Sequence, residues 1–166
     1  HKERPMKAPQ VVALALAFPL SAACNPFQRS PAAEITTREI PVTERWNATL
    51  GTPSSLAGAV QIRGTAWMGS QSGASETQVQ IRVSNATPGG IHPWHVHRGQ
   101  CGNDQGIWGE AGEYEPMRIN DEGNGGASAT IGERTPTDGQ FYVNVHASPS
   151  NLGTIVACGN LAPPAR

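Results

Sequence analysis

Three histidines have the residue type and the spacing that a metal site requires. His95 and His97 stand two residues apart, and His146 lies further along the chain. On a β-strand, side chains two residues apart point to the same face and are separated by roughly 6.6 Å along the strand. Two imidazoles at that spacing can converge on one ion, each at a distance of about 2.0 Å. The spacing therefore predicts that His95 and His97 form part of a metal site.

The segment that contains His146 predicts a third ligand on another strand. Apolar and polar residues alternate over residues 141–146, and His146 is the last of the polar ones. We predict that His95, His97 and His146 are metal ligands and that, with a redox-active metal, they are also the catalytic residues. The alternative is that the three rings lie apart or bind no metal, because an H-x-H pair alone does not specify a metal site.

Two cysteines predict a covalent link close to these histidines. Cys24 belongs to an N-terminal segment described below, which leaves Cys101 and Cys158 as an even pair. In an exported chain such a pair predicts a disulfide, which here would join the loop after His97 to the last strand. The alternative is two buried thiols, which an oxidising compartment disfavours.

Short strands and tight turns are expected to position these side chains. The 166 residues include 19 Gly and 14 Pro, a composition that argues against a helical bundle. The alternation with a period of two is clearest over residues 77–84, and Trp94 and Val96 are expected to face the core. Further strands are expected over residues 57–67, 91–97, 117–120, 127–131, 141–146 and 154–161. The sequence predicts an all-β fold, a Greek-key β-sandwich or barrel of about eight antiparallel strands, over residues 46–163.

The first 45 residues differ from the rest of the chain. A basic start (residues 1–7) precedes an apolar run that ends in small residues and Cys24. Residues 1–24 resemble a bacterial lipoprotein signal peptide, which implies lipidation of Cys24. The alternatives are an ordinary secretory signal and a retained anchor of a subunit in a larger membrane complex. Residues 25–45 contain three prolines and are predicted to be a tether.

The N-terminal segment and the charge balance indicate the expected cellular location and the expected partners. The basic end is expected inside and the domain on the periplasmic side of a bacterial cell envelope, anchored to the membrane through the N-terminus. Protein partners in a membrane complex are a further expectation. From Cys24 onward the chain has 9 Arg against 12 Asp or Glu. Because no basic patch is present, nucleic acid is excluded as a partner.

Three segments resemble copper/zinc superoxide dismutases. Residues 90–97, with the sequence GIHPWHVH, resemble the G-x-H-G-F-H-V-H segment of that family. Residues 117–128 resemble its strand–D-G-N-G–strand segment, and residues 142–159 resemble its V-V-V-H…D-L-G…A-C-G ending. The resemblance covers most of residues 56–161, in the same order as in the family. It implies an eight-stranded Greek-key barrel and superoxide as the small-molecule substrate.

The resemblance also implies individual residue roles and a cofactor. It implies copper binding by His95, His97 and His146, a structural role for His92 in bracing a loop, and a disulfide between Cys101 and Cys158. The sequence has no His between Cys101 and His146, so the family's zinc site cannot form and the expected cofactor is copper without zinc. The family's active-site Arg, which attracts and orients the anion, corresponds to Ile155 here.

Together these features predict a membrane-anchored, copper-binding superoxide dismutase-like protein in which dismutation is weak or lost. If it is an enzyme, it is expected to be a copper-only superoxide dismutase. The alternatives are a periplasmic copper carrier and a non-catalytic accessory or structural subunit of a larger membrane protein complex. Residues 141–146 also resemble the Y-V-N-V-H strand of CHRD domains, which are mostly without known chemistry.

Overall fold

The computed structural model describes residues 44–59 and 61–165 of the chain. The predicted signal or anchor segment, Cys24 and all of the predicted tether before residue 44 lie outside the described residues. The first strand begins at Glu44, two residues before the predicted start of the domain. Within the described part of the chain, no helix has the length and the apolar character needed to cross a membrane.

The described residues form ten strands and two 3-10 helices of three residues each. The strands are β1 (Glu44–Gly51), β2 (Arg63–Ser70), β3 (Thr77–Ser84), β4 (Ile91–His92), β5 (Trp94–Gln100), β6 (Asn103–Ile107), β7 (Met117–Arg118), β8 (Gly125–Ile131), β9 (Phe141–Ser148) and β10 (Asn151–Leu161). The helices are η1 (Ser54–Leu56) and η2 (Ala111–Glu113). The predicted all-β class is therefore confirmed.

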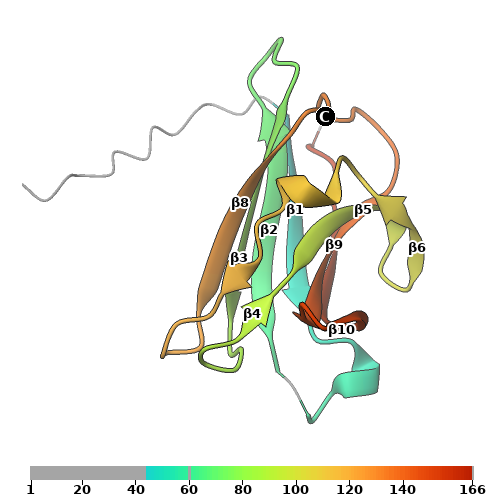
Figure 1. Cartoon of the computed structure of the whole chain (residues 1–166). Helices are drawn as coiled ribbons and strands as arrows, with labels where there is room; N and C mark the ends of the chain where they lie inside the picture. The colour runs from blue at the N-terminus through green and yellow to red at the C-terminus, as the bar shows by residue number, and fades with distance from the viewer. Residues whose placement is uncertain (1–43, 60, 166) are drawn as a thin grey trace, which may run out of the picture. The chain divides into compact units, whose positions relative to one another are not determined.

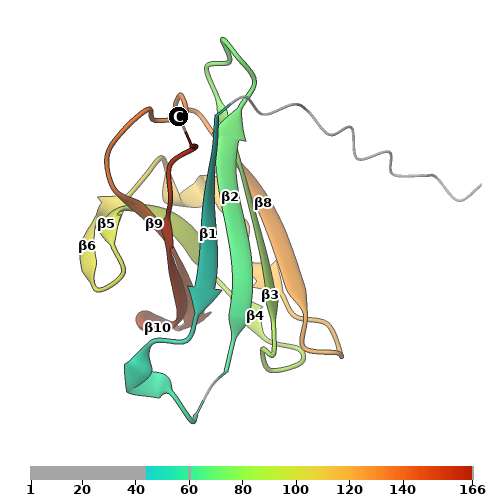
Figure 2. The ribbon, with the colours of Figure 1, turned by 180° about the vertical axis from the view of Figure 1, so that it is seen from behind.

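Eight of these strands form one antiparallel sheet in the order β6-β5-β9-β10-β1-β2-β3-β8, while β4 and β7 pair with each other. The large sheet curls into a half-barrel, with β8, β3, β2 and β1 side by side and β5 and β9 across from them (Figure 1). Seen from behind, β10 continues the sheet beyond β1 (Figure 2). Because the chain passes from β3 to β5 and β6, returns to β8 and then passes to β9, strands distant in sequence become neighbours.

The hydrophobic core lies on the inner side of this curled sheet. In β3 the predicted alternation is confirmed, since buried Thr and Val or Ile residues alternate with polar residues that are half-buried or exposed. From the opposite half, Trp94 and Val96 are fully buried in the same core, as predicted, together with Val143 and Val145. The strands β5 and β9 thus use one face for packing, which leaves their other face for polar side chains.

Several strand boundaries differ from the expectation, and two of the observed strands were not expected. The strand expected over residues 57–67 lies at Arg63–Ser70 instead, and Gly58 has a φ of +98°, which is not the extended backbone of a strand. The strand β1 was not predicted, although its residues alternate between the core and the surface. The strand β6 was not predicted either, because it has no apolar alternation that a sequence pattern would reveal.

The turn between β5 and β6 brings the β6 hairpin close to β5. Gly99 has a φ of +103°, and a Cβ at this position would collide with the carbonyl oxygen of Asn103. Only a glycine therefore allows this close approach without a shift of the backbone. Cys101, in the turn, forms a disulfide with Cys158 of β10, which confirms the predicted pair.

Candidate metal centre

The pairing of β5 with β9 brings the three predicted ligands onto one face. His95 lies opposite Asn144, and His97 lies opposite Tyr142. His146 is two residues beyond Asn144, so it lies diagonally beside His95 on the same face of the sheet. This is the face opposite the core, as the alternation in the sequence predicted.

The ring nitrogens of these histidines are close enough to share an ion. One nitrogen from each ring lies within 4.8 Å of the other two, and His95 Nδ1 is 3.1 Å from His146 Nε2. Two nitrogens at that separation, each about 2.0 Å from one ion, would subtend roughly 100° at it, which suits three- or four-coordinate geometry. The exposed fractions of His95, His97 and His146 are 9%, 5% and 7%. The cluster is therefore a buried site that could bind a metal ion.

Hydrogen bonds determine which nitrogens remain free to bind a metal. His146 Nδ1 lies 2.6 Å from the carbonyl oxygen of Leu152, and His97 Nδ1 lies 2.7 Å from Asp104 Oδ1. Because both oxygens only accept, each Nδ1 carries a hydrogen, and the Nε2 of the neutral His146 ring accepts a hydrogen bond from His95 Nδ1. His97 Nε2 is buried and has no hydrogen-bond partner in the described part of the chain. An unpartnered buried acceptor is costly, and a metal ion would supply the missing partner.

Burial also keeps two of the three rings in the form that binds metals. Burial, with a smaller contribution from His146 and His97, lowers the pKa of His95 from 6.5 to about 4. Burial likewise lowers the pKa of His146, although the hydrogen bond to Leu152 opposes this shift. Both imidazoles are therefore neutral near pH 7, as metal binding requires.

Asp104 and Tyr142 both contact the ring of His97. Asp104 Oδ1 accepts hydrogen bonds from His97 Nδ1 and, at 2.8 Å, from the backbone N–H of Gly106. Although burial raises the pKa of Asp104, the bonds from Gly106, His97 and Tyr142 lower it below 3.8 overall. Burial and the nearby Asp104 charge raise the pKa of Tyr142 to about 12, and its ring packs 5.2 Å from that of His97. Asp104 is thus an anion at neutral pH, and its carboxylate fixes the orientation of the His97 ring.

Sequence reasoning did not identify Asp104. It lies seven residues after His97, in the polar β6 segment, where neither alternation nor a motif marks it. The contact exists because the turn at Gly99 folds β6 back along β5, where His97 pairs with Ile107 and Gly99 with Asp104. Tyr142 was expected on the same face as His146, but nothing in its spacing indicated a contact with Asp104.

A pocket of 1030 Å³ opens over two of the histidines, His97 and His146. Its walls come from residues 51–56, the turn before β6, the polar face of β9 and the start of β10. Asp104 is the only acidic side chain in the described lining, and the lining contains no Lys or Arg. Ile155 lines the pocket and pairs with His146 across β10 and β9. The described pocket wall is therefore apolar beside His146, at Ile155.

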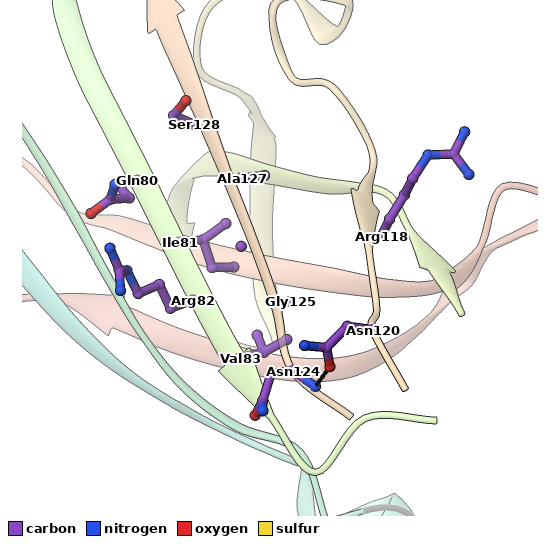
Figure 3. A pocket seen from close by; sticks show the side chains of 11 residues that line it. Gln80, Ile81, Arg82, Val83, Arg118, Asn120, Asn124, Gly125, Ala127 and Ser128 are labelled. Carbon is purple, nitrogen blue, oxygen red and sulfur yellow. Dashed lines mark hydrogen bonds between the residues drawn. The ribbon is translucent and has the colours of Figure 1, made fainter. Parts of the chain in front are cut away.

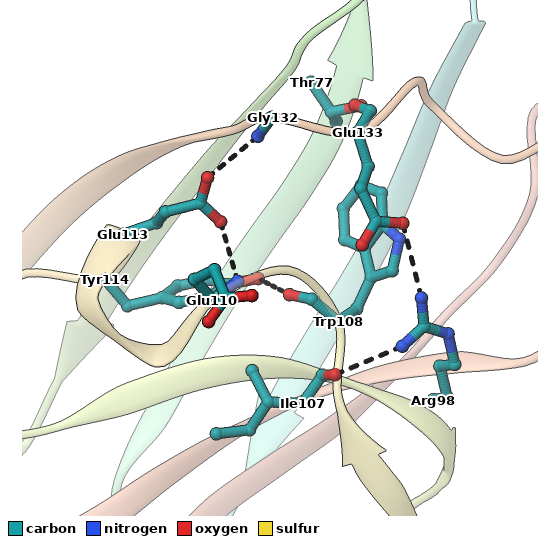
Figure 4. A network of polar contacts seen from close by, with 9 residues as sticks. All are labelled: Thr77, Arg98, Ile107, Trp108, Glu110, Glu113, Tyr114, Gly132 and Glu133. Atoms are coloured by element: carbon teal, nitrogen blue, oxygen red, sulfur yellow. Dashed lines mark hydrogen bonds and ion pairs between the residues drawn. The ribbon is translucent and has the colours of Figure 1, made fainter.

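Arg98, the cation next to the ligands in the sequence, is directed elsewhere. Its guanidinium donates to the carbonyl oxygen of Ile107 at 3.2 Å and to Glu133 Oε2 at 3.3 Å (Figure 4). In the same network, the Glu113 carboxylate accepts hydrogen bonds from the backbone N–H groups of Glu110 and Gly132 (Figure 4). These groups fix the loops around η2, and Arg98 is not part of the described lining of the pocket over the histidines.

His92 lies outside the cluster of three histidines. It is buried, and its Nδ1 lies 2.8 Å from the backbone carbonyl oxygen of His146. Since that oxygen only accepts, His92 donates to it and thereby holds the backbone of β9 beside a predicted ligand. Its position is that of a bracing residue.

A second pocket, of 700 Å³, lies between β3, β8 and the segment from β7 to β8. It contains none of the predicted site residues. Figure 3 shows Arg82 and Arg118 on opposite sides of this pocket, so their guanidinium groups do not converge on one point. The chemistry of the described residues is therefore concentrated in the histidine cluster.

Comparisons with known proteins add no further constraint. The chain matches no protein-family model, and a search of the curated proteins gives no match either. The fold and the site thus define the protein by themselves. It is an all-β half-barrel with a disulfide and a buried three-histidine cluster that could bind a metal ion.

Proposed function

We propose that this protein is a copper-binding, superoxide dismutase-like protein whose dismutase activity is weak or absent. The observation that carries this proposal is the cluster of His95, His97 and His146, in which the buried Nε2 of His97 has no hydrogen-bond partner in the described chain. Neutral imidazoles suit copper well, and copper is bound most tightly among the common divalent metals. The three sequence segments that resemble copper/zinc superoxide dismutases support the same assignment. When bound, copper supplies the one-electron redox chemistry that dismutation requires.

The residues around the cluster support the weak-activity part of the proposal. Superoxide is an anion, and a site that consumes it rapidly benefits from a positive potential along its approach. Here the described lining offers one carboxylate, Asp104, and no cation, and Ile155 stands where the resembling family has its arginine. The proposal includes no zinc, because the sequence lacks the histidines for that site.

Copper content and superoxide consumption of the full chain test this proposal. We expect one copper per chain, which is lost in His95→Ala and His146→Ala. Thr135→Val is the control, because it removes a buried hydroxyl outside the cluster and outside the described pocket lining and should keep its copper. Retention of copper by a His95→Ala/His97→Ala double variant would overturn the site. A superoxide rate near the diffusional limit of about 10⁸–10⁹ M⁻¹s⁻¹ would overturn the weak-activity part.

A copper carrier is the second candidate, and the charge of the pocket favours it. A wall with one carboxylate and no cation attracts a metal ion and does not attract an anionic substrate. A carrier transfers its single copper to an acceptor and shows no turnover. Measurement of copper transfer to a competing chelator, beside the superoxide assay, distinguishes the two functions.

The proposed location is the periplasmic side of a bacterial cell envelope, with lipidated Cys24 as the anchor. The supporting observation is the basic, apolar and small-residue order of residues 1–24. We expect the full chain in the membrane fraction and the Cys24→Ser variant in the soluble fraction. If protein partners co-purify from the membrane with a copper-free chain, the accessory-subunit alternative replaces the proposed function.

A further inference from the structure

Asp104 is a group of the site to which the proposed function assigns no role beyond its negative charge. Its carboxylate bonds to His97 at 2.7 Å on one side and is 58% exposed at the pocket on the other. It also accepts the N–H of Gly106, so the hairpin backbone fixes its position. The same carboxylate therefore contacts a predicted ligand and faces the solvent through which an ion arrives.

Two consequences follow from this placement. First, the carboxylate holds the hydrogen of His97 on Nδ1 and so directs the Nε2 lone pair into the site, as carboxylates do behind metal-bound histidines. Second, the carboxylate is the only acidic group in the described lining, which has no Lys or Arg, so it contributes a negative potential at the pocket. The first effect strengthens metal binding, and the second attracts cations and repels small anions.

We propose that Asp104 is the specificity-determining residue of this pocket: it favours entry and binding of a metal cation, orients His97 for that cation, and disfavours small anions. The inference rests on the proposed function, since it concerns the same site. It explains how a dismutase-like fold can hold copper while reacting slowly with superoxide. Asp104 acts through His97 and through the potential of the pocket, so it is a positioning residue and does not itself bind the metal.

Two substitutions separate the two effects. Asp104→Asn removes the charge, but the amide oxygen can still accept the hydrogen bond from His97 Nδ1. Asp104→Ala removes both the charge and the acceptor. The matched control is Asp138→Asn, which makes the same change of charge at an exposed loop position outside the pocket lining. All variants are made in the full chain.

The measurements are copper affinity, by competition with a chelator, and azide affinity of the Cu(II) form, by absorption and electron paramagnetic resonance. For Asp104→Asn we expect azide affinity to rise about threefold at low salt, because a partly exposed charge acts through a high effective dielectric constant. This gain should disappear at 1 M salt. For Asp104→Ala we expect copper affinity to fall about tenfold or more, as for loss of a group that orients a ligand. Asp138→Asn should change neither quantity.

The outcomes distinguish this inference from the proposed function. If the wild-type chain binds no copper, both fail. If the wild-type chain binds copper, but Asp104→Asn leaves azide affinity unchanged or shifts it as Asp138→Asn does, only the inference about Asp104 is overturned. Equal losses of copper and azide affinity in Asp104→Asn would indicate general damage to the site and would also overturn it. Thermal unfolding of each copper-free variant checks that the fold is intact.

Discussion

Removal of the disulfide should destabilise this domain strongly. Cys101 and Cys158 are separated by 57 residues in the chain, so the disulfide closes a long loop in the unfolded state. In the chain-entropy relation, a loop of that length loses about 14 cal/mol/K, which corresponds to about 4 kcal/mol at 25 °C. This is a large part of the 5–15 kcal/mol that is typical of the unfolding free energy of a domain. We therefore expect the variant Cys101→Ser/Cys158→Ser to lose about 4 kcal/mol of stability.

Urea unfolding of the copper-free full chain measures this loss. With a slope of about 2 kcal/mol/M, the midpoint should fall by about 2 M. Cys24→Ser is introduced into every variant, so that no third thiol can form a different disulfide. A Cys24→Ser chain treated with a reducing agent should show the same decrease as the double serine variant. A decrease below about 1 kcal/mol would refute the loop-closure argument, because the disulfide would then not restrict the unfolded chain as that relation requires.

Three other predictions concern the site. The pKa of His95 is lowered to about 4 in the folded chain, so between pH 6.5 and pH 4 the unfolded chain binds more protons than the folded chain. The free energy of unfolding should therefore be highest above pH 6.5 and should decrease as the pH falls toward 4. We expect the free energy of unfolding to fall by about 1–2 kcal/mol after allowance for solvent screening. Urea midpoints measured at pH 7 and pH 4.5 give this decrease, and the decrease should be smaller for His95→Ala. Ile155→Arg should raise the superoxide rate of the copper-loaded chain about tenfold at low salt, and a rate independent of salt would contradict electrostatic attraction. Gly99→Ala should lower both the urea midpoint and the copper affinity, because its Cβ would collide with Asn103 in the hairpin that carries Asp104. Gly153→Ala is the control, because a Cβ at that position meets open space and should change stability little.

Local patterns in the sequence were sufficient for the fold class and for the face on which the histidines lie. Alternation with a period of two is a property of single strands, so it could be recognised over residues 77–84 and 141–146 without knowledge of any partner. The strand at Arg63–Ser70 was misplaced, because glycine conformation and strand pairing determined its start. The polar strand β6 has no such local pattern and exists only because it pairs with β5.

The sequence by itself determined which residues could hold a metal, because an H-x-H pair on a strand and a histidine on the polar side of another strand need no tertiary information. It also determined the cysteine pair, since only two cysteines remain after Cys24. Only the tertiary structure decided that the rings of His95 and His146 approach to 3.1 Å and that Asp104 lies behind His97. The physical reason is that these contacts depend on strand register and on the path of a hairpin, and both are determined by pairing between segments distant in the chain.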